Sequence, residues 1–131
     1  MKRIKSLLVF IIVGIALQAS SAPVFDIPVK IFKAIEIGDV ENLSVHFSES
    51  IELIILDQED IYSRQQANLI LKDFFNKNRP KKFTVLHQGG TEKAKYAIGK
   101  LETTGGTYRV HFLVKMKDGK PLIHQLRIQE E

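Results

Sequence analysis

Hydrophobic residues recur at helical spacing in three segments of the chain. The first predicted helix begins near Pro28, whose ring suits a first helical turn, and ends at Gly38. Asp39 is a suitable cap for a short second helix. Ser63 caps a third, longer helix that ends before Pro80. The apolar side of this third helix consists of Ala67, Ile70, Leu71, Phe74 and Phe75.

The other apolar segments have the patterns of strands. Residues 51–56 form a nearly continuous apolar run, which fits a strand buried on both faces. From Lys81 onward apolar residues alternate, and three glycine-containing turns divide this part into four strands. The predicted order is therefore helix, helix, strand, helix and four antiparallel strands. This is an α+β fold with helices packed on one face of a curved sheet.

Pairing of the last three strands assigns their side chains to two faces. We expect three-residue loops at 103–105 and 117–119, because such loops place the apolar residues of neighbouring strands on one common face. In this register Tyr96 and His124 both lie opposite Phe112. One face of the sheet is then apolar and aromatic, and the other is polar.

The predicted apolar face contains candidates for a ligand pocket. A histidine in an apolar cavity can act as a neutral acid or base, although most histidines in such positions are core residues with one hydrogen bond. His87 alternates with Phe83 and Val85 and is predicted to share this face. The candidate pocket residues are Tyr62, His87, Tyr96, Phe112 and His124.

The opposite face contains a candidate anion site. Arg109 is predicted to lie opposite Arg127, and two opposed arginines repel unless an anion lies between them. A solvated face with glutamates as counter-charges is the alternative. The candidate anion-site residues are Arg109, His111, Gln125 and Arg127. An apolar patch predicted on the same face, typical of a dimer surface, consists of Leu86, Leu101, Leu113 and Ile123.

Composition excludes several functions. The 131 residues contain no cysteine, which excludes disulfides, thiolate zinc sites and thiol catalysis. The four histidines occur singly, so no metal site is expected, and without a glycine-rich phosphate loop no cofactor is expected either. Of the 19 basic residues, three precede position 6, which leaves 16 against 15 acidic ones and gives no support for nucleic-acid binding.

The first residues have the pattern of a secretory signal peptide. Basic residues precede an apolar run at 7–17, which is too short to span a bilayer and is followed by small residues. Cleavage is expected after Ser21 or Ala22. We therefore predict a signal peptide at 1–21 and one domain at 22–131. The protein would be periplasmic or extracellular, with no stable membrane anchor after cleavage.

Three segments resemble a known family. They are DQEDIYSRQQANLILKDFF at 57–75, LHQGGTEKAKYAIG at 86–99 and GKPLIHQLRI at 119–128. The chain resembles small secreted bacterial proteins catalogued as a domain of unknown function, with a nuclear-transport-factor-2-like, cystatin-like cone fold. The resemblance implies a pocket between the long helix and the sheet, and often a dimer through the outer sheet face. Isomerase-type members of the wider nuclear-transport-factor-2-like superfamily place a carboxylate base in the cone.

Three functional hypotheses follow. The leading one is a noncatalytic envelope protein that binds a small molecule or a protein partner, through the cone pocket or the sheet face. The second is an acid/base enzyme of isomerase or dehydratase type, in which His87 or His124 works with a carboxylate from Asp57, Glu59 or Asp60. The third is a structural module that forms a homodimer.

Overall fold

The computed structural model describes residues 25–131, and the predicted signal peptide lies outside them. Its elements are α1 (Val29–Ile37), α2 (Val40–Ser44), β1 (Phe47–Ile55), β2 (Gln58–Ser63), α3 (Arg64–Lys77), β3 (Pro80–Gly90), β4 (Ala94–Thr103), β5 (Gly106–Lys117) and β6 (Lys120–Glu130). No helix in this part of the chain is long and apolar enough to cross a membrane.

The three helices begin and end where the capping residues predict. Gly38 ends α1 in the left-handed conformation, with φ +70°. The Asp39 side chain accepts a hydrogen bond from the backbone of Asn42 at the start of α2. At α3, Ser63 and Gln66 form a capping box in which each side chain accepts a hydrogen bond from the other residue's backbone N–H. Local sequence therefore specifies these helices.

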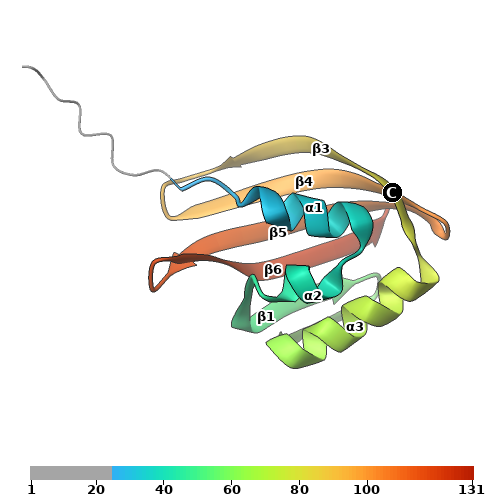
Figure 1. Ribbon diagram of the computed structural model, residues 1–131, viewed down its shortest axis with the longest axis horizontal. Coiled ribbons are helices and arrows are strands. Elements are labelled where there is room, and N and C mark those ends of the chain that lie inside the picture. The colour runs from blue at the N-terminus through green and yellow to red at the C-terminus, as the bar shows by residue number, and fades with distance from the viewer. Residues whose placement is uncertain (1–24) are drawn as a thin grey trace, which may run out of the picture.

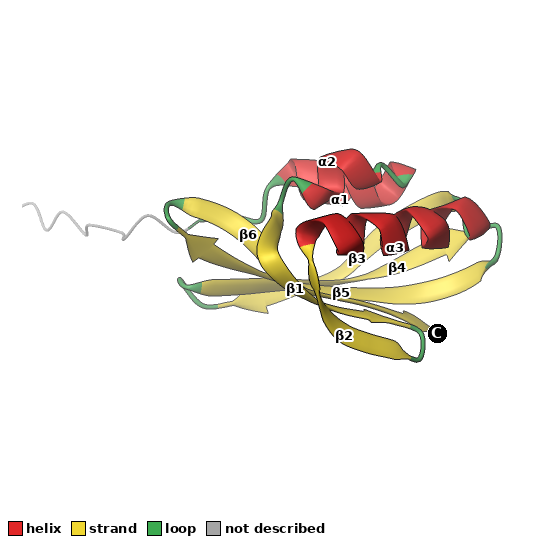
Figure 2. Ribbon diagram, turned by 90° about the horizontal axis from the view of Figure 1, so that it is seen from below, coloured by secondary structure: helices red, strands yellow, loops and turns green. Residues whose placement is uncertain are grey.

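The six strands form one curved sheet in the order β2-β1-β6-β5-β4-β3. Neighbouring strands are antiparallel except β1 and β6, which run parallel. Figures 1 and 2 show α1, α2 and α3 together on one face of this sheet, with no helix on the other. The predicted α+β class and the order of its elements are confirmed. The structure adds the short edge strand β2, which is mostly exposed.

The predicted loops of three residues are wrong, because both hairpins turn in two residues. Thr103 pairs with Gly106, and the Thr103 hydroxyl donates a hydrogen bond of 2.7 Å to the Gly106 carbonyl. Lys117 pairs with Lys120, and the two residues between them have φ values of +51° and +76°. Positive φ at both turn positions matches the right-handed twist of the flanking strands, which favours this tighter turn.

The tighter turn exchanges the two faces of β4. Ala97, not Tyr96, lies opposite Phe112, and Gly99, not Ile98, lies opposite Val110. Ala97 and Gly99 therefore lie beneath the helices, while Tyr96 and Ile98 turn to the outer face. A one-residue change of register moves every side chain of a strand to the other face, which explains the size of this correction.

A β-bulge in β6 corrects the second predicted register. Leu113 pairs with Gln125 but Val114 pairs with Ile123, so His124 is an extra residue. Because the bulge adds one residue, Ile123 faces the core and is 0% exposed.

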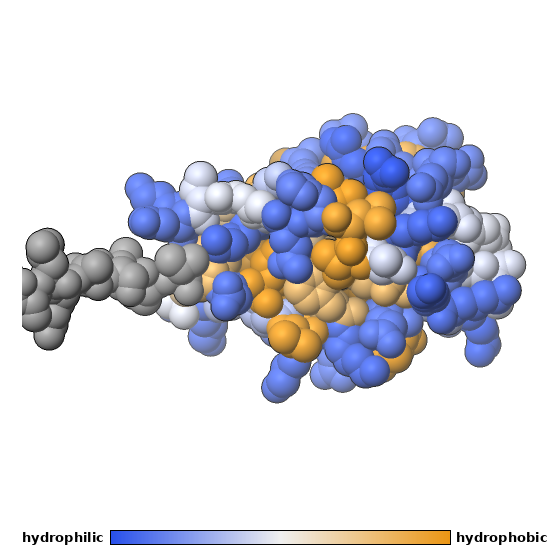
Figure 3. All heavy atoms as spheres, turned by 90° about the horizontal axis from the view of Figure 1, so that it is seen from above, coloured by the Kyte–Doolittle hydropathy of each residue, from blue (hydrophilic) through white to orange (hydrophobic). Residues whose placement is uncertain are grey.

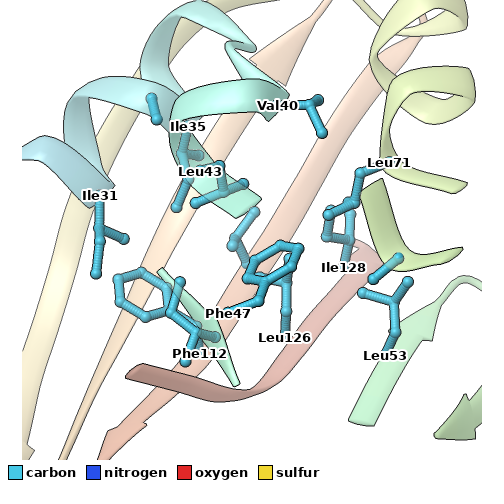
Figure 4. Close-up of a cluster of buried hydrophobic side chains, with 14 of the residues drawn as sticks. Ile31, Ile35, Val40, Leu43, Phe47, Leu53, Leu71, Phe112, Leu126 and Ile128 are labelled. Atoms are coloured by element: carbon cyan, nitrogen blue, oxygen red, sulfur yellow. The ribbon is translucent and has the colours of Figure 1, made fainter. Parts of the chain in front are cut away.

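A hydrophobic core fills the space between the helices and the sheet. Figure 4 shows side chains from α1, α2 and α3 meeting those of the inner sheet face. Phe47 and Phe112 are the largest of these fully buried side chains. The Phe112 ring lies 5.7 Å from that of Phe32 on α1. The interior of the described domain is thus closely packed around aromatic rings.

Candidate functional site

The five predicted pocket residues do not line one cavity, although two of them, His87 and Tyr96, are in contact on the helix-free face of the sheet. Phe112 is a core residue with 0% exposure, and Tyr62 packs against the core from β2. His87 is exposed on β3, at the other edge of the sheet from β2. His124 is half-buried at the bulge of β6, and its Nε2 atom has no hydrogen-bond partner among the described residues. The register corrections explain why these side chains do not line one cavity.

The helix-free face of the sheet brings together a different set of polar side chains. One row crosses the strands β3, β4, β5 and β6 through the successive cross-strand pairs of His87, Ile98, His111 and Arg127. The neighbouring row consists of Tyr96, Leu113, Gln125 and Glu52. We call these two rows, on which no helix lies, the outer face.

Aromatic side chains from β3, β4 and β5 contact one another on the outer face. His87 Nε2 lies 2.9 Å from the Tyr96 hydroxyl oxygen, which makes a hydrogen bond between neighbouring strands. On its other side, the Tyr96 ring lies 5.9 Å from the ring of His111. His87 reaches this face because a bulge between Val85 and His87 shifts the alternation that the sequence predicts.

Arg127 lies at the β6 end of the first row of the outer face. It is half-buried, and its Nε atom is buried without a hydrogen-bond partner among the described residues. It pairs across strands with His111, not with Arg109 as predicted. Burial and the charge of Arg127 lower the pKa of His111. His111 is therefore neutral at pH 7, and Arg127 provides the positive charge of this site.

The two other predicted anion-site residues have partners of their own. Arg109 Nη2 lies 3.5 Å from Glu131 Oε1 near the C-terminus. Gln125 donates a hydrogen bond of 3.1 Å to Glu52 Oε2 from the neighbouring strand β1. His111 and Arg127 are therefore direct cross-strand neighbours. Arg109 pairs with Gln129 instead, and one residue pair, Val110 with Ile128, lies between the two.

The predicted apolar patch on the outer face is smaller than expected. Leu101 and Ile123 are buried in the core, because of the corrected registers. Leu113 remains half-exposed on the outer face, and Leu86 on β3 is 51% exposed. Figure 3, seen from the β3 side, shows hydrophobic side chains gathered in the middle of the surface with hydrophilic ones around them.

The groups proposed for acid/base catalysis lie far apart. Leu56 donates its backbone N–H to Ile128, so the acidic turn after β1 lies beside the end of β6. His124 is four residues away along β6, about 13 Å at the usual rise of a strand. His87 lies on β3, five strand spacings from β2, or about 24 Å. Within residues 25–131 no group of three metal-ligating side chains is close enough to hold a metal ion.

The sequence analysis missed a hollow on the helix-covered side of the described domain. This hollow lies between α1 and α2 and has a volume of about 420 Å³. It is lined by Lys30, Lys33, Ala34, Ile37, Asp39, Asn42, Val45 and His46. Two lysines spaced by three residues on α1 could have indicated it, because such residues project from the same side of a helix. A smaller hollow of about 350 Å³ lies between α3 and the β1–β2 turn, where the resemblance implied a pocket.

Helices on one face of a curved sheet define the class of this protein. It has a nuclear-transport-factor-2-like, cystatin-like cone fold. A nuclear-transport-factor-2-like protein from Cytophaga hutchinsonii superposes with a TM-score of 0.58 at 16% identity, covering 78% of this chain and 90% of that one. This similarity establishes the fold only.

The family assignment is more specific. The model of the domain of unknown function DUF4783 matches residues 28–129, and the chain belongs to this family. Crystal structures of DUF4783 proteins from Bacteroides ovatus and Bacteroides fragilis are each 31% identical to it, with TM-scores of 0.77. They cover 80% and 81% of this chain, and it covers 96% and 100% of theirs. No curated protein matches the chain. The predicted family resemblance is confirmed.

Proposed function

We propose that the protein is a noncatalytic binding protein of the cell envelope, which recognises a carboxylate or phosphate group of its ligand or partner on the outer face of the sheet. Secretion by a cleaved signal peptide is part of this proposal and rests on the sequence pattern at 1–21.

The observation that carries the proposal is the environment of Arg127. Its guanidinium is half-buried, its Nε has no hydrogen-bond partner, and no carboxylate of the described residues lies within 4.0 Å of it. An arginine in this state has donors left for an anion, and a guanidinium binds carboxylate and phosphate groups through two parallel hydrogen bonds. Neutral His111 beside it can supply a further donor.

The surroundings of Arg127 favour a binding surface over an enzyme. Apolar Ile98 and Leu113 lie between the polar residues of the two rows, which gives the mixture of apolar and hydrogen-bonding groups found at recognition sites. No carboxylate that could serve as a base approaches the histidines of the outer face among the residues that the structure describes. The acid/base hypothesis therefore has no assembled site to support it.

The test is an NMR titration of residues 22–131 with acetate, succinate and inorganic phosphate. We expect chemical-shift changes that cluster on β4, β5 and β6 and that disappear in Arg127→Gln. Arg79→Gln is the matched control, because Arg79 is exposed in the loop between α3 and β3 and should leave the titration unchanged. Changes that spread evenly over surface lysines, or that survive Arg127→Gln, would contradict the proposal.

A further inference from the structure

The hollow between α1 and α2 is separate from the outer face. It lies on the helix-covered side of the sheet, and none of its lining residues belongs to the two rows of the outer face. Its volume of about 420 Å³ falls within the range of small-molecule sites, about 300–1,000 Å³. The chemistry of its lining indicates what kind of molecule it could recognise.

The residues that line this hollow carry more positive than negative charge. Lys30 has no carboxylate within 4.0 Å among the described residues, and Lys33 approaches Glu36 only at 3.9 Å. The one acidic residue of the lining, Asp39, already accepts hydrogen bonds from Asn42. An anion would thus meet the unpaired ammonium group of Lys30 and that of Lys33, for which only the distant carboxylate of Glu36 competes.

Three further residues of the lining, Ala34, Ile37 and Val45, are apolar. Ile37 and Val45 are 56% and 62% exposed, so both offer apolar surface to a ligand. Ala34 lines the same hollow between them, although it is only 2% exposed.

We propose that this hollow binds one medium-chain fatty acid, with its carboxylate at Lys30 and Lys33 and its alkyl chain against Ala34, Ile37 and Val45. His46 lies at the same hollow, where burial and the nearby Lys30 charge lower its pKa. A neutral imidazole there offers a hydrogen-bond donor to the carboxylate without adding charge.

The first experiment compares monomeric ligands by isothermal titration calorimetry with residues 22–131. Decanoate should bind one molecule per protein. Octanoate should bind about 15-fold more weakly, because each buried methylene changes affinity about fourfold. Nonylammonium has the same alkyl chain and the opposite charge, and it should bind at least tenfold more weakly than decanoate. Acetate that competes as well as decanoate would overturn the role of the chain.

Variants then locate the site. Lys30→Ala combined with Lys33→Ala, and separately Val45→Asp, should each weaken decanoate binding at least tenfold. Leu69→Asp is the control, because Leu69 on α3 is 63% exposed, as Val45 is 62%, but lies outside the hollow. Unchanged affinity in the lysine variant or in Val45→Asp, with each variant shown to be folded by its NMR spectrum, would overturn the proposal.

Two further measurements distinguish the fatty-acid site from a membrane-surface contact and from the outer face. Sedimentation with phosphatidylglycerol vesicles that requires Lys30 and Lys33, without binding of decanoate, would identify a membrane-surface contact and overturn the fatty-acid site. An NMR titration with decanoate should give its saturating chemical-shift changes on α1 and α2, and changes confined to β4, β5 and β6 would place the carboxylate at the outer face and overturn the fatty-acid site. The two proposed sites can therefore be tested independently of each other.

Discussion

The bulge in β6 makes a quantitative prediction about two neighbouring residues. Without the bulge, strand alternation places Leu122 in the core and Ile123 outside. With it, Ile123 is 0% exposed and pairs with Phe47 and Val114, whereas Leu122 is half-exposed. Alanine substitutions at these two positions remove the same number of carbon atoms, so their effects on stability compare burial directly.

The structure predicts a large difference between the two variants. Ile123→Ala should lower the free energy of unfolding by about 2–5 kcal/mol, because it removes buried methyl groups and leaves a cavity. Leu122→Ala should cost about 1 kcal/mol or less, since much of that side chain already contacts water. Urea denaturation followed by circular dichroism measures both. A loss of about 3 kcal/mol corresponds to a fall of about 1–3 M in the urea midpoint.

The reasoning is refuted if Leu122→Ala is the more damaging of the two, or if the two variants are equal. Should Ile123→Ala fail to fold, Ile123→Val provides a milder comparison, with an expected loss of about 0.5–1.5 kcal/mol. Leu122→Val is its matched partner and should then have the smaller effect.

Three other predictions concern the sheet, the long helix and pH. Gly99→Ala should lower stability by about 1–3 kcal/mol, because its Cβ would clash with the Phe83 ring. A variant as stable as the wild type in urea would contradict that packing. Ser63→Ala should cost about 1 kcal/mol through loss of the α3 capping box, with Ser63→Gly costing less, and equal melting temperatures for all three proteins would count against this cap. The pKa of His111 is lower in the folded protein, so the unfolded chain binds protons more readily below about pH 6.5. Stability should therefore fall between pH 7.5 and pH 5.5, and it should fall less in His111→Gln. An identical pH dependence of the two urea midpoints would refute this.

The helices could be predicted from the sequence because their signals are local. A capping box, an N-terminal proline and a glycine at a helix end each act within a few residues, and the structure has α1, α2 and α3 where these signals place them. The strand β2 was missed because residues 58–63 are mostly polar and exposed, so no apolar alternation marks them.

The candidate site was harder to predict because it depends on strand register. The bulges before His87 and at His124 each change the face of the residues that follow, and neither follows from apolar alternation alone. Turn length has the same effect on Tyr96, which moves from the inner to the outer face. The prediction that Arg127 belongs to a polar outer face remained valid, but its neighbours required the three-dimensional structure.

The most direct test of the proposed function is photo-crosslinking in cells that produce the protein. The crosslinking residue p-benzoylphenylalanine would replace Leu113 on the outer face or, as a control, Leu69 on α3. Intact mass spectrometry of the purified protein detects an attached small molecule, a partner protein or a second copy of the chain. We predict an adduct at position 113 that is absent at position 69 and is lost with Arg127→Gln. An adduct only at position 69, or one at position 113 that persists in Arg127→Gln, would contradict the proposal that the outer face binds an anionic group.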